Sequence, residues 1–251
     1  MSRPPPPEHF QGKAVADHLK DARMKGAQAS TETHGPQLPG PIAALLSCIK
    51  EISAAFLILY AILAALIPNE PLLFPLFACF GLGLIIWETG RSAIRGWGKL
   101  ERLHRVIEEE RWEIEHHREQ EKEELTEMYA AKGFEGKLLE EVINVLMADD
   151  NRLLRVMLEE ELGLSLEVYE HPLKQATGAF FGSLIASSCL LLSLFFWPIL
   201  GLPITAILLI GIASFRSAKL EKRRQIYSMV WNIALLIFAS SATYFLAKAL
   251  S

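Results

Sequence analysis

The sequence predicts an all-α membrane protein with five transmembrane helices and a cytosolic helical insert between spans two and three. The first observation is composition: 51% of the 251 residues are hydrophobic and 22% are charged, with a mean hydropathy of +0.25. Such a chain is too apolar for a soluble domain unless the two classes are segregated. The second observation is that segregation: apolar residues fill 42–67, 71–87, 176–213 and 226–247, whereas charged residues fill 99–174 and 216–224. The third is a strong asymmetry of Lys and Arg between the loops.

The apolar stretches define the spans. An α-helix rises about 1.5 Å per residue, so about 20 residues cross a hydrocarbon core roughly 30 Å thick. The expected spans are 42–67, 72–94, 173–197, a short fourth span at 204–215, and 226–246. The chain then divides into a polar N-terminal segment and linker, spans one and two, the insert, and spans three to five, at 1–40, 41–96, 97–172 and 173–251.

The basic residues set the expected orientation, because cytosolic loops carry an excess of Lys and Arg. They follow span two and separate spans four and five, whereas the turns after spans one and three contain none. We therefore expect the N-terminus and the insert in the cytosol. The N-terminus lacks the apolar core of a secretory signal, and the sequence suits a bacterial inner membrane or a vacuole-like membrane. A net charge of −4 argues against nucleic acid as a partner.

The insert is expected to form three helices. The first is expected to run unbroken from Lys99 to about Lys132, where Gly133 ends it. A second is expected near 137–147 and a third near 151–162, with Gly163 as its terminating residue.

Ten glutamates lie between Glu108 and Glu127. Four of them fall within a stripe roughly 80° wide on a helix: Glu110, Glu113, Glu121 and Glu124. Like charges on one stripe repel, and several carboxylates together suit a divalent cation. On a straight helix the two pairs lie about 16 Å apart, so one ion cannot bridge them and further ligands must come from another helix or subunit. The alternative is a solvated acidic helix, since no apolar residue lies between Ile114 and Leu125.

Two further pairs of residues are candidates for binding or conducting ions. Met157 and Glu161 are four residues apart on one helix face, and a thioether beside a carboxylate suits Fe²⁺ or another transition metal. The alternative is a core Met with a surface Glu. Glu51 and Glu88 lie near the cytosolic ends of spans one and two, where intramembrane carboxylates often line ion or proton paths; the alternative places both at the membrane interface.

The remaining motifs indicate packing. Gly178-x-x-x-Gly182 allows close helix contact in a bundle or a dimer. The three cysteines show no metal or redox spacing and are interpreted as packing residues. With no Walker-type loop and no Ser/His/Asp constellation, we expect no enzymatic activity and no prosthetic group.

The insert resembles the vacuolar iron transporter family over about residues 99–190. The similarity rests on the Glu spacing, a Tyr-x-x-x-Gly stretch and a Met-x-x-Glu-Glu-Leu-Gly-Leu stretch. In this chain they read Glu110-Arg-Trp-Glu113-Ile-Glu, Glu121-Lys-Glu-Glu124, Glu127-Met-Tyr129-Ala-Ala-Lys-Gly133-Phe and Met157-Leu-Glu-Glu-Glu161-Leu-Gly163-Leu.

That resemblance implies a dimeric five-span transporter that moves Fe²⁺, and often Mn²⁺, out of the cytosol in exchange for protons. It implies that the metal ligands of the cytosolic domain are Glu110, Glu113, Glu121, Glu124, Met157 and Glu161. The chain departs from the family in span one, where Lys50-Glu51-Ile52 replaces an Asn-Asp-Gly signature, and at Leu84 and Leu158, which replace methionines.

The sequence therefore predicts a divalent-metal exporter whose partners are metal ions, protons, the bilayer and a second copy of the chain. Two other functions stay open. One is a membrane-anchored sensor or buffer that binds metal without transport, which the altered first span favours. The other is a structural membrane protein with an acidic arm and no metal.

Overall fold

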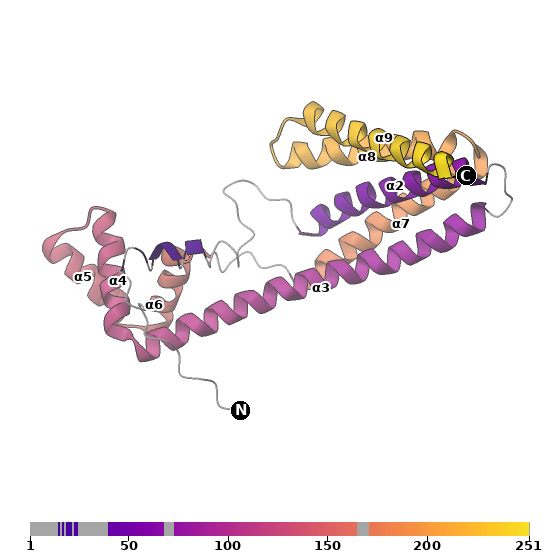
Figure 1. Ribbon diagram of the computed structural model, residues 1–251. Helices are drawn as coiled ribbons and strands as arrows, with labels where there is room; N and C mark the ends of the chain where they lie inside the picture. Colours follow the sequence, from indigo (N-terminus) through magenta and orange to yellow (C-terminus); the bar gives the residue numbers. More distant parts are fainter. Residues whose placement is uncertain are drawn as a thin grey trace. The chain divides into compact units, whose positions relative to one another are not determined.

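The computed structural model describes residues 15, 17, 19–21, 23, 24, 40–67, 73–164 and 171–250. Within these ranges the chain is helical and contains no strand. The sequence also allows a short amphipathic helix near residues 10–24, of which only 15, 17, 19–21, 23 and 24 are described, and these are helical. The helices, in order, are α2 Gly40–Leu66, α3 Leu73–His116, α4 Arg118–Ala131, α5 Gly136–Met147, α6 Asp150–Val156, the π-helix η1 Met157–Glu161, α7 Pro172–Phe196, α8 Gly201–Leu220 and α9 Gln225–Leu250 (Figure 1).

Five of these helices, α2, α3, α7, α8 and α9, are long and apolar enough to cross a membrane. The expectation of five spans is confirmed, with one boundary corrected. The fourth span is not short, because α8 already begins at Gly201 and ends at Leu220. Pro203 was expected in the preceding turn, but it falls in the first turn of α8, where a missing backbone N–H breaks no hydrogen bond.

The chain folds as two compact units. The membrane unit comprises His34–Trp97 and Glu170–Ser251, and the insert unit comprises Met1–Thr33 and Gly98–Tyr169. Helix α3 contributes to both units, because it continues past the apolar part of span two as far as His116.

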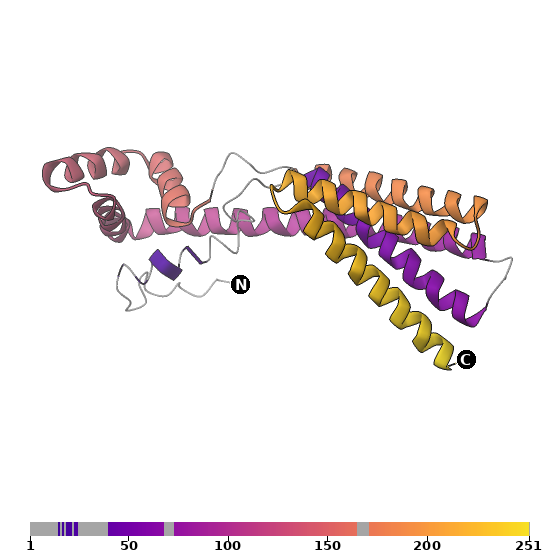
Figure 2. The same cartoon turned by 90° about the horizontal axis from the view of Figure 1, so that it is seen from above.

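In the membrane unit, α2 packs against α7, α8 and α9, and α8 packs against α7 and α9 (Figure 2). Glycine spacing explains the closest of these contacts. A Cβ atom added at Gly178 would lie 2.0 Å from the Pro41 carbonyl oxygen, and one at Gly182 would lie 2.4 Å from that of Leu45. The small-residue motif therefore serves the packing of α7 on α2 within one chain.

In the insert unit, residues from α3, α4, α5, α6 and η1 share one apolar core. The first insert helix was expected to be continuous over 99–132, and this is wrong: α3 ends at His116, and His117 leaves helical geometry with φ −126° and ψ 35°. Ile114 and Leu125 would lie about 16 Å apart on a straight helix, yet both are buried in the same core. The break at His117 allows α4 to place its apolar face on that core.

Candidate metal centre

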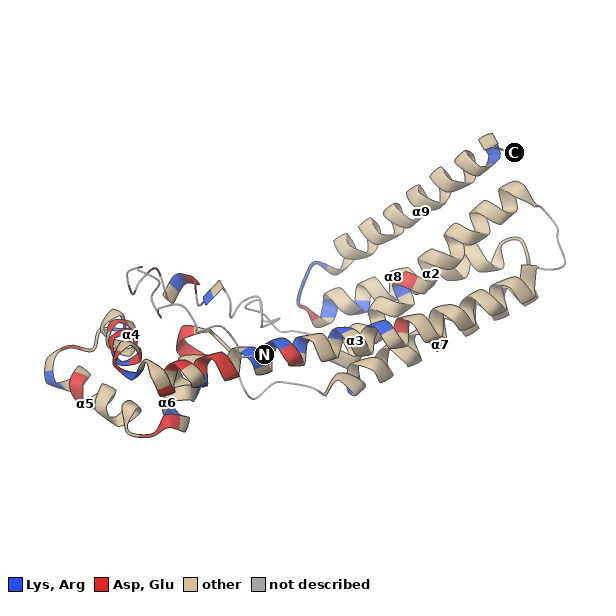
Figure 3. Cartoon of the chain, turned by 60° about the horizontal axis from the view of Figure 1, so that its bottom comes forward, with Lys and Arg blue, Asp and Glu red and all other residues tan. Residues whose placement is uncertain are grey.

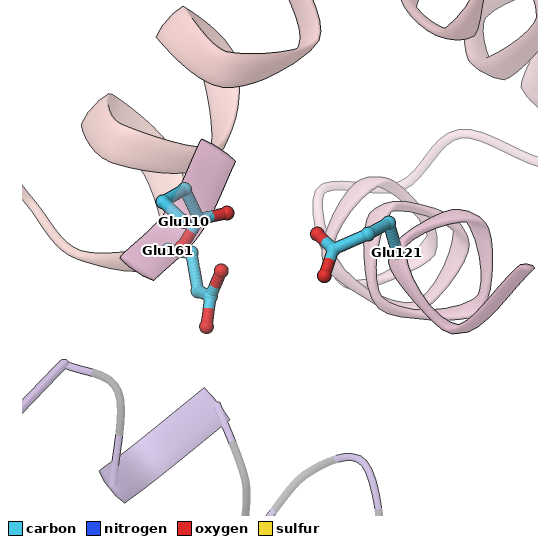
Figure 4. Close-up of side chains that lie close together, drawn as sticks. All are labelled: Glu110, Glu121 and Glu161. Atoms are coloured by element: carbon cyan, nitrogen blue, oxygen red, sulfur yellow. The ribbon is translucent and has the colours of Figure 1, made fainter. Parts of the chain in front are cut away.

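Three glutamates from three helical elements meet in the insert unit. Glu110 comes from the last turns of α3, Glu121 from the first turn of α4, and Glu161 from the end of η1. One carboxylate oxygen of each lies within 4.8 Å of one from each of the other two, and all three residues are buried. Figure 4 shows the Glu121 carboxylate directed toward those of Glu110 and Glu161. Several oxygen ligands around one point are what a hard or borderline divalent cation requires.

Ion pairs at both ends of α4 hold Glu121 in place. At its start, Arg118 donates from one guanidinium nitrogen to Asp150 and from the other to the Met147 carbonyl, each at 2.6 Å. At its end, the Lys132 ammonium lies 2.6 Å from the Glu160 carboxylate on η1. The helix is therefore attached at one end to the α5–α6 junction and at the other to the element that carries Glu161.

A π-helical segment positions the third glutamate. The third insert helix was expected to be α-helical to Leu162, but η1 replaces its last part, and the Leu162 N–H donates to the Met157 carbonyl five residues back at 3.2 Å. Gly163, with φ +64°, then ends the helix as predicted. Single π turns inside α-helices are frequent at functional sites.

Burial and mutual repulsion strongly perturb these carboxylates. Burial first, and then the charges of Glu161 and Glu121, raise the pKa of Glu110 well above its usual value. Burial and the charge of Glu124 raise the pKa of Glu121 to about 9, and burial and the charge of Glu113 raise the pKa of Glu124 to about 8. At neutral pH, these groups therefore hold protons unless a cation replaces them.

The structure corrects three expectations about the stripe. The stripe is not solvated, because Glu110, Glu121 and Glu124 are all buried. The two glutamate pairs are not separated by three turns, because the break at His117 brings Glu121 to Glu110. Glu161 is not a surface residue, being only 3% exposed.

Two of the other predicted ligands, Glu113 and Glu124, lie close enough to the three-carboxylate cluster to raise the pKa of Glu110. Glu113 is half-buried, and its charge contributes to the raised pKa of Glu110, Glu121 and Glu124. Met157 is fully buried in the apolar core, at the opposite end of η1 from Glu161.

The two membrane carboxylates share a partner that the sequence did not reveal. Arg91 of α3 forms ion pairs with both Glu51 of α2 and Glu88 of α3. Glu88 is buried and Glu51 is exposed, and the Cys48 sulfur lies 4.0 Å from a Glu88 oxygen. Figure 3 shows most of the charged residues of the membrane unit at one end of its helices. The spacing of three residues between Glu88 and Arg91 was the available signal for this pairing.

Five helices of membrane-crossing length and a buried cluster of three carboxylates define a polytopic helical membrane protein with a candidate divalent-cation centre. A family model described as the VIT family matches residues 99–248. The chain therefore belongs to the VIT family, which confirms the resemblance to vacuolar iron transporters. No curated protein matches the chain. Membership indicates a membrane metal transporter rather than an enzyme. The matched residues include the candidate centre and leave Glu51 and Glu88 outside.

Proposed function

We propose that the protein exports Fe²⁺, and also Mn²⁺, from the cytosol in exchange for protons. The observation that carries this proposal is the buried cluster of Glu110, Glu121 and Glu161, with one oxygen of each within 4.8 Å of the others. In this proposal, Glu113, Glu124 and Met157 complete the ligand set from the surrounding positions. The cytosolic location of the insert unit rests on the distribution of Lys and Arg.

Proton exchange follows from the chemistry of the cluster. Three buried carboxylates cannot all be ionised together without a cation among them. At neutral pH they either retain protons or release them to a metal ion, so metal binding and proton binding compete. An imposed pH gradient can then drive metal movement in the opposite direction to the protons.

The proposed path through the membrane passes Glu51 and Glu88, between the first spans of two copies of the chain. The buried Glu88 supports it, because an ionisable side chain buried within a transmembrane helix is costly and commonly functional. An ion that uses both carboxylates must displace the Arg91 guanidinium that now pairs with them.

Flux measurements on the full chain in liposomes test this proposal. With a pH gradient imposed, we expect saturable Fe²⁺ and Mn²⁺ uptake that is lost in Glu51→Ala. Glu101→Ala, at an exposed position in the insert unit, is the matched control and should transport like the wild type. Absence of proton-coupled flux in the wild type would refute export by antiport.

The second candidate, a metal sensor or buffer without transport, is favoured by one observation: Arg91 already occupies both membrane carboxylates. Calorimetric measurement of metal affinity distinguishes such a sensor or buffer from a protein that binds no metal. We expect Glu110→Ala combined with Glu113→Ala to weaken metal binding at least tenfold. Unchanged affinity would remove the metal-site assignment, and intact binding without flux would establish the sensor.

A further inference from the structure

The membrane unit contains a cavity of about 290 Å³ at the end of its helices where Glu88 and Arg91 lie. Residues of α2, α3, α7 and α8 line it, including Lys50, Ser92, Arg95 and Gln175. Its volume is close to the lower end, about 300 Å³, of cavities that hold small ligands.

The carboxylates of this cavity already have basic partners. Glu88 pairs with Arg91, and Glu221 pairs with Arg223 while accepting a hydrogen bond from Ser217 at 3.0 Å. Lys50 and Arg95, in contrast, form no ion pair with any residue in the described ranges. The cavity therefore presents two cationic side chains without a counter-ion, which disfavours a metal ion and favours an anion.

A buried hydroxyl adds an unused hydrogen-bond donor. Ser92 is 7% exposed, and its Oγ has no hydrogen-bond partner within the described part of the chain. Serine in a helix commonly bonds to a carbonyl one turn back, as Ser53 does at 2.7 Å. Gln175 brings an amide to the same cavity from α7. An acceptor-rich ligand would satisfy these donors.

We propose that this cavity binds a phosphate group, held by Lys50 and Arg95 with hydrogen bonds from Ser92 and Gln175. Phosphate oxygens are strong acceptors for such charge-assisted hydrogen bonds. The group belongs to the headgroup of an anionic lipid or to free phosphate. The cavity lies at the end of the bundle where basic residues gather, and basic pockets between transmembrane helices at such a surface bind lipid headgroups. The cavity shares Glu88 and Arg91 with the proposed metal path, but the phosphate proposal rests on Lys50, Arg95, Ser92 and Gln175 and does not require transport.

The test uses the full chain and compares two double variants of equal charge. Lys50→Gln with Arg95→Gln removes both cations of the cavity. Arg216→Gln with Lys219→Gln is the control, because these exposed residues of α8 do not line the cavity. Each protein is reconstituted in phosphatidylcholine vesicles containing phosphatidylglycerol and extracted, and its retained lipid is counted by native mass spectrometry. Delipidated protein is titrated in parallel with inorganic phosphate, and its unfolding midpoint is followed.

A lipid source predicts that the wild type and the control retain phosphatidylglycerol, and that the cavity variant retains at least tenfold less. A free-phosphate source predicts a phosphate-dependent rise in midpoint that only the cavity variant loses. Lys50→Arg with Arg95→Lys keeps both charges and should bind, which separates lost binding from lost folding. Equal loss in both double variants, or no binding of either probe by the wild type, would overturn the proposal.

Discussion

Replacing Glu121 by glutamine tests whether metal binding displaces a proton from the cluster. The amide has the shape of a protonated carboxyl group but cannot ionise. Glu121, with its pKa raised to about 9, is almost fully protonated at pH 7 in the metal-free protein. The substitution should therefore disturb the metal-free fold little at pH 7, while removing one ligand charge and one proton that the metal would displace.

The magnitude follows from the geometry. Two charges no more than 4.8 Å apart repel by at least about 3.5 kcal/mol at an effective dielectric constant of roughly 20. Ionising a group with a pKa of about 9 at pH 7 costs about 2.7 kcal/mol, which is of similar size. Metal binding by the wild type bears this cost, so its affinity should rise about tenfold per pH unit for each proton released.

Calorimetry with Mn²⁺ on the full chain, in buffers of different ionisation enthalpy, counts the protons released on binding. We expect Glu121→Gln to release about one proton fewer than the wild type. Its deficit in affinity should also widen by about tenfold per pH unit between pH 7 and pH 9. The control is Glu123→Gln, an exposed position on the same helix. An unchanged proton count in Glu121→Gln would show that this carboxylate is not exchanged for metal.

Three further predictions concern stability. The metal-free protein should lose stability as pH rises from about 4.5 to about 9, because the folded state keeps the Glu121 proton that the unfolded state releases. Chemical unfolding across this window should give a slope that is smaller in Glu121→Gln by up to about 1.4 kcal/mol per pH unit, while Glu110 and Glu124 maintain the remainder. Gly182→Ala should destabilise the membrane unit by about 1–3 kcal/mol, because the added Cβ would overlap the α2 backbone. Gly83→Ala adds a Cβ in open space and should leave the stability unchanged, so thermal unfolding of the two variants gives the comparison. Arg91→Gln should cost about 3 kcal/mol by leaving Glu88 buried without its cation, and an unchanged midpoint would refute that pairing.

The membrane spans could be predicted from the sequence because span length depends on one local property. Uninterrupted apolar stretches of about 20 residues can satisfy their backbone hydrogen bonds in lipid only as helices. The start of α8 differs from the expected residue 204 because a proline before an apolar stretch fits a turn and the first turn of a helix equally well.

The geometry of the site could not be predicted in the same way. The glutamates were identified from their spacing, but a straight helix keeps Glu110 and Glu121 far apart, and nothing local at His117 marks a helix end. The break follows from long-range packing, because Leu125 and Met128 reach the core that Ile114 occupies only if α4 changes direction. Likewise, the pairing of Arg91 with Glu51 depends on the approach of α2 to α3.

The negative charge of the carboxylates is neutralised differently in the two units, and this difference predicts what each group contributes to metal binding and to flux. In the insert unit, protons held at raised pKa values offset the repulsion between Glu110 and Glu121, and a metal ion can replace protons without moving a side chain away. In the membrane unit, Arg91 supplies the positive charge, and an ion can use both Glu51 and Glu88 only after the guanidinium moves. Equilibrium metal binding should therefore be insensitive to Arg91→Gln, whereas flux should change. A protein whose flux ignores Arg91 does not move ions past these two carboxylates.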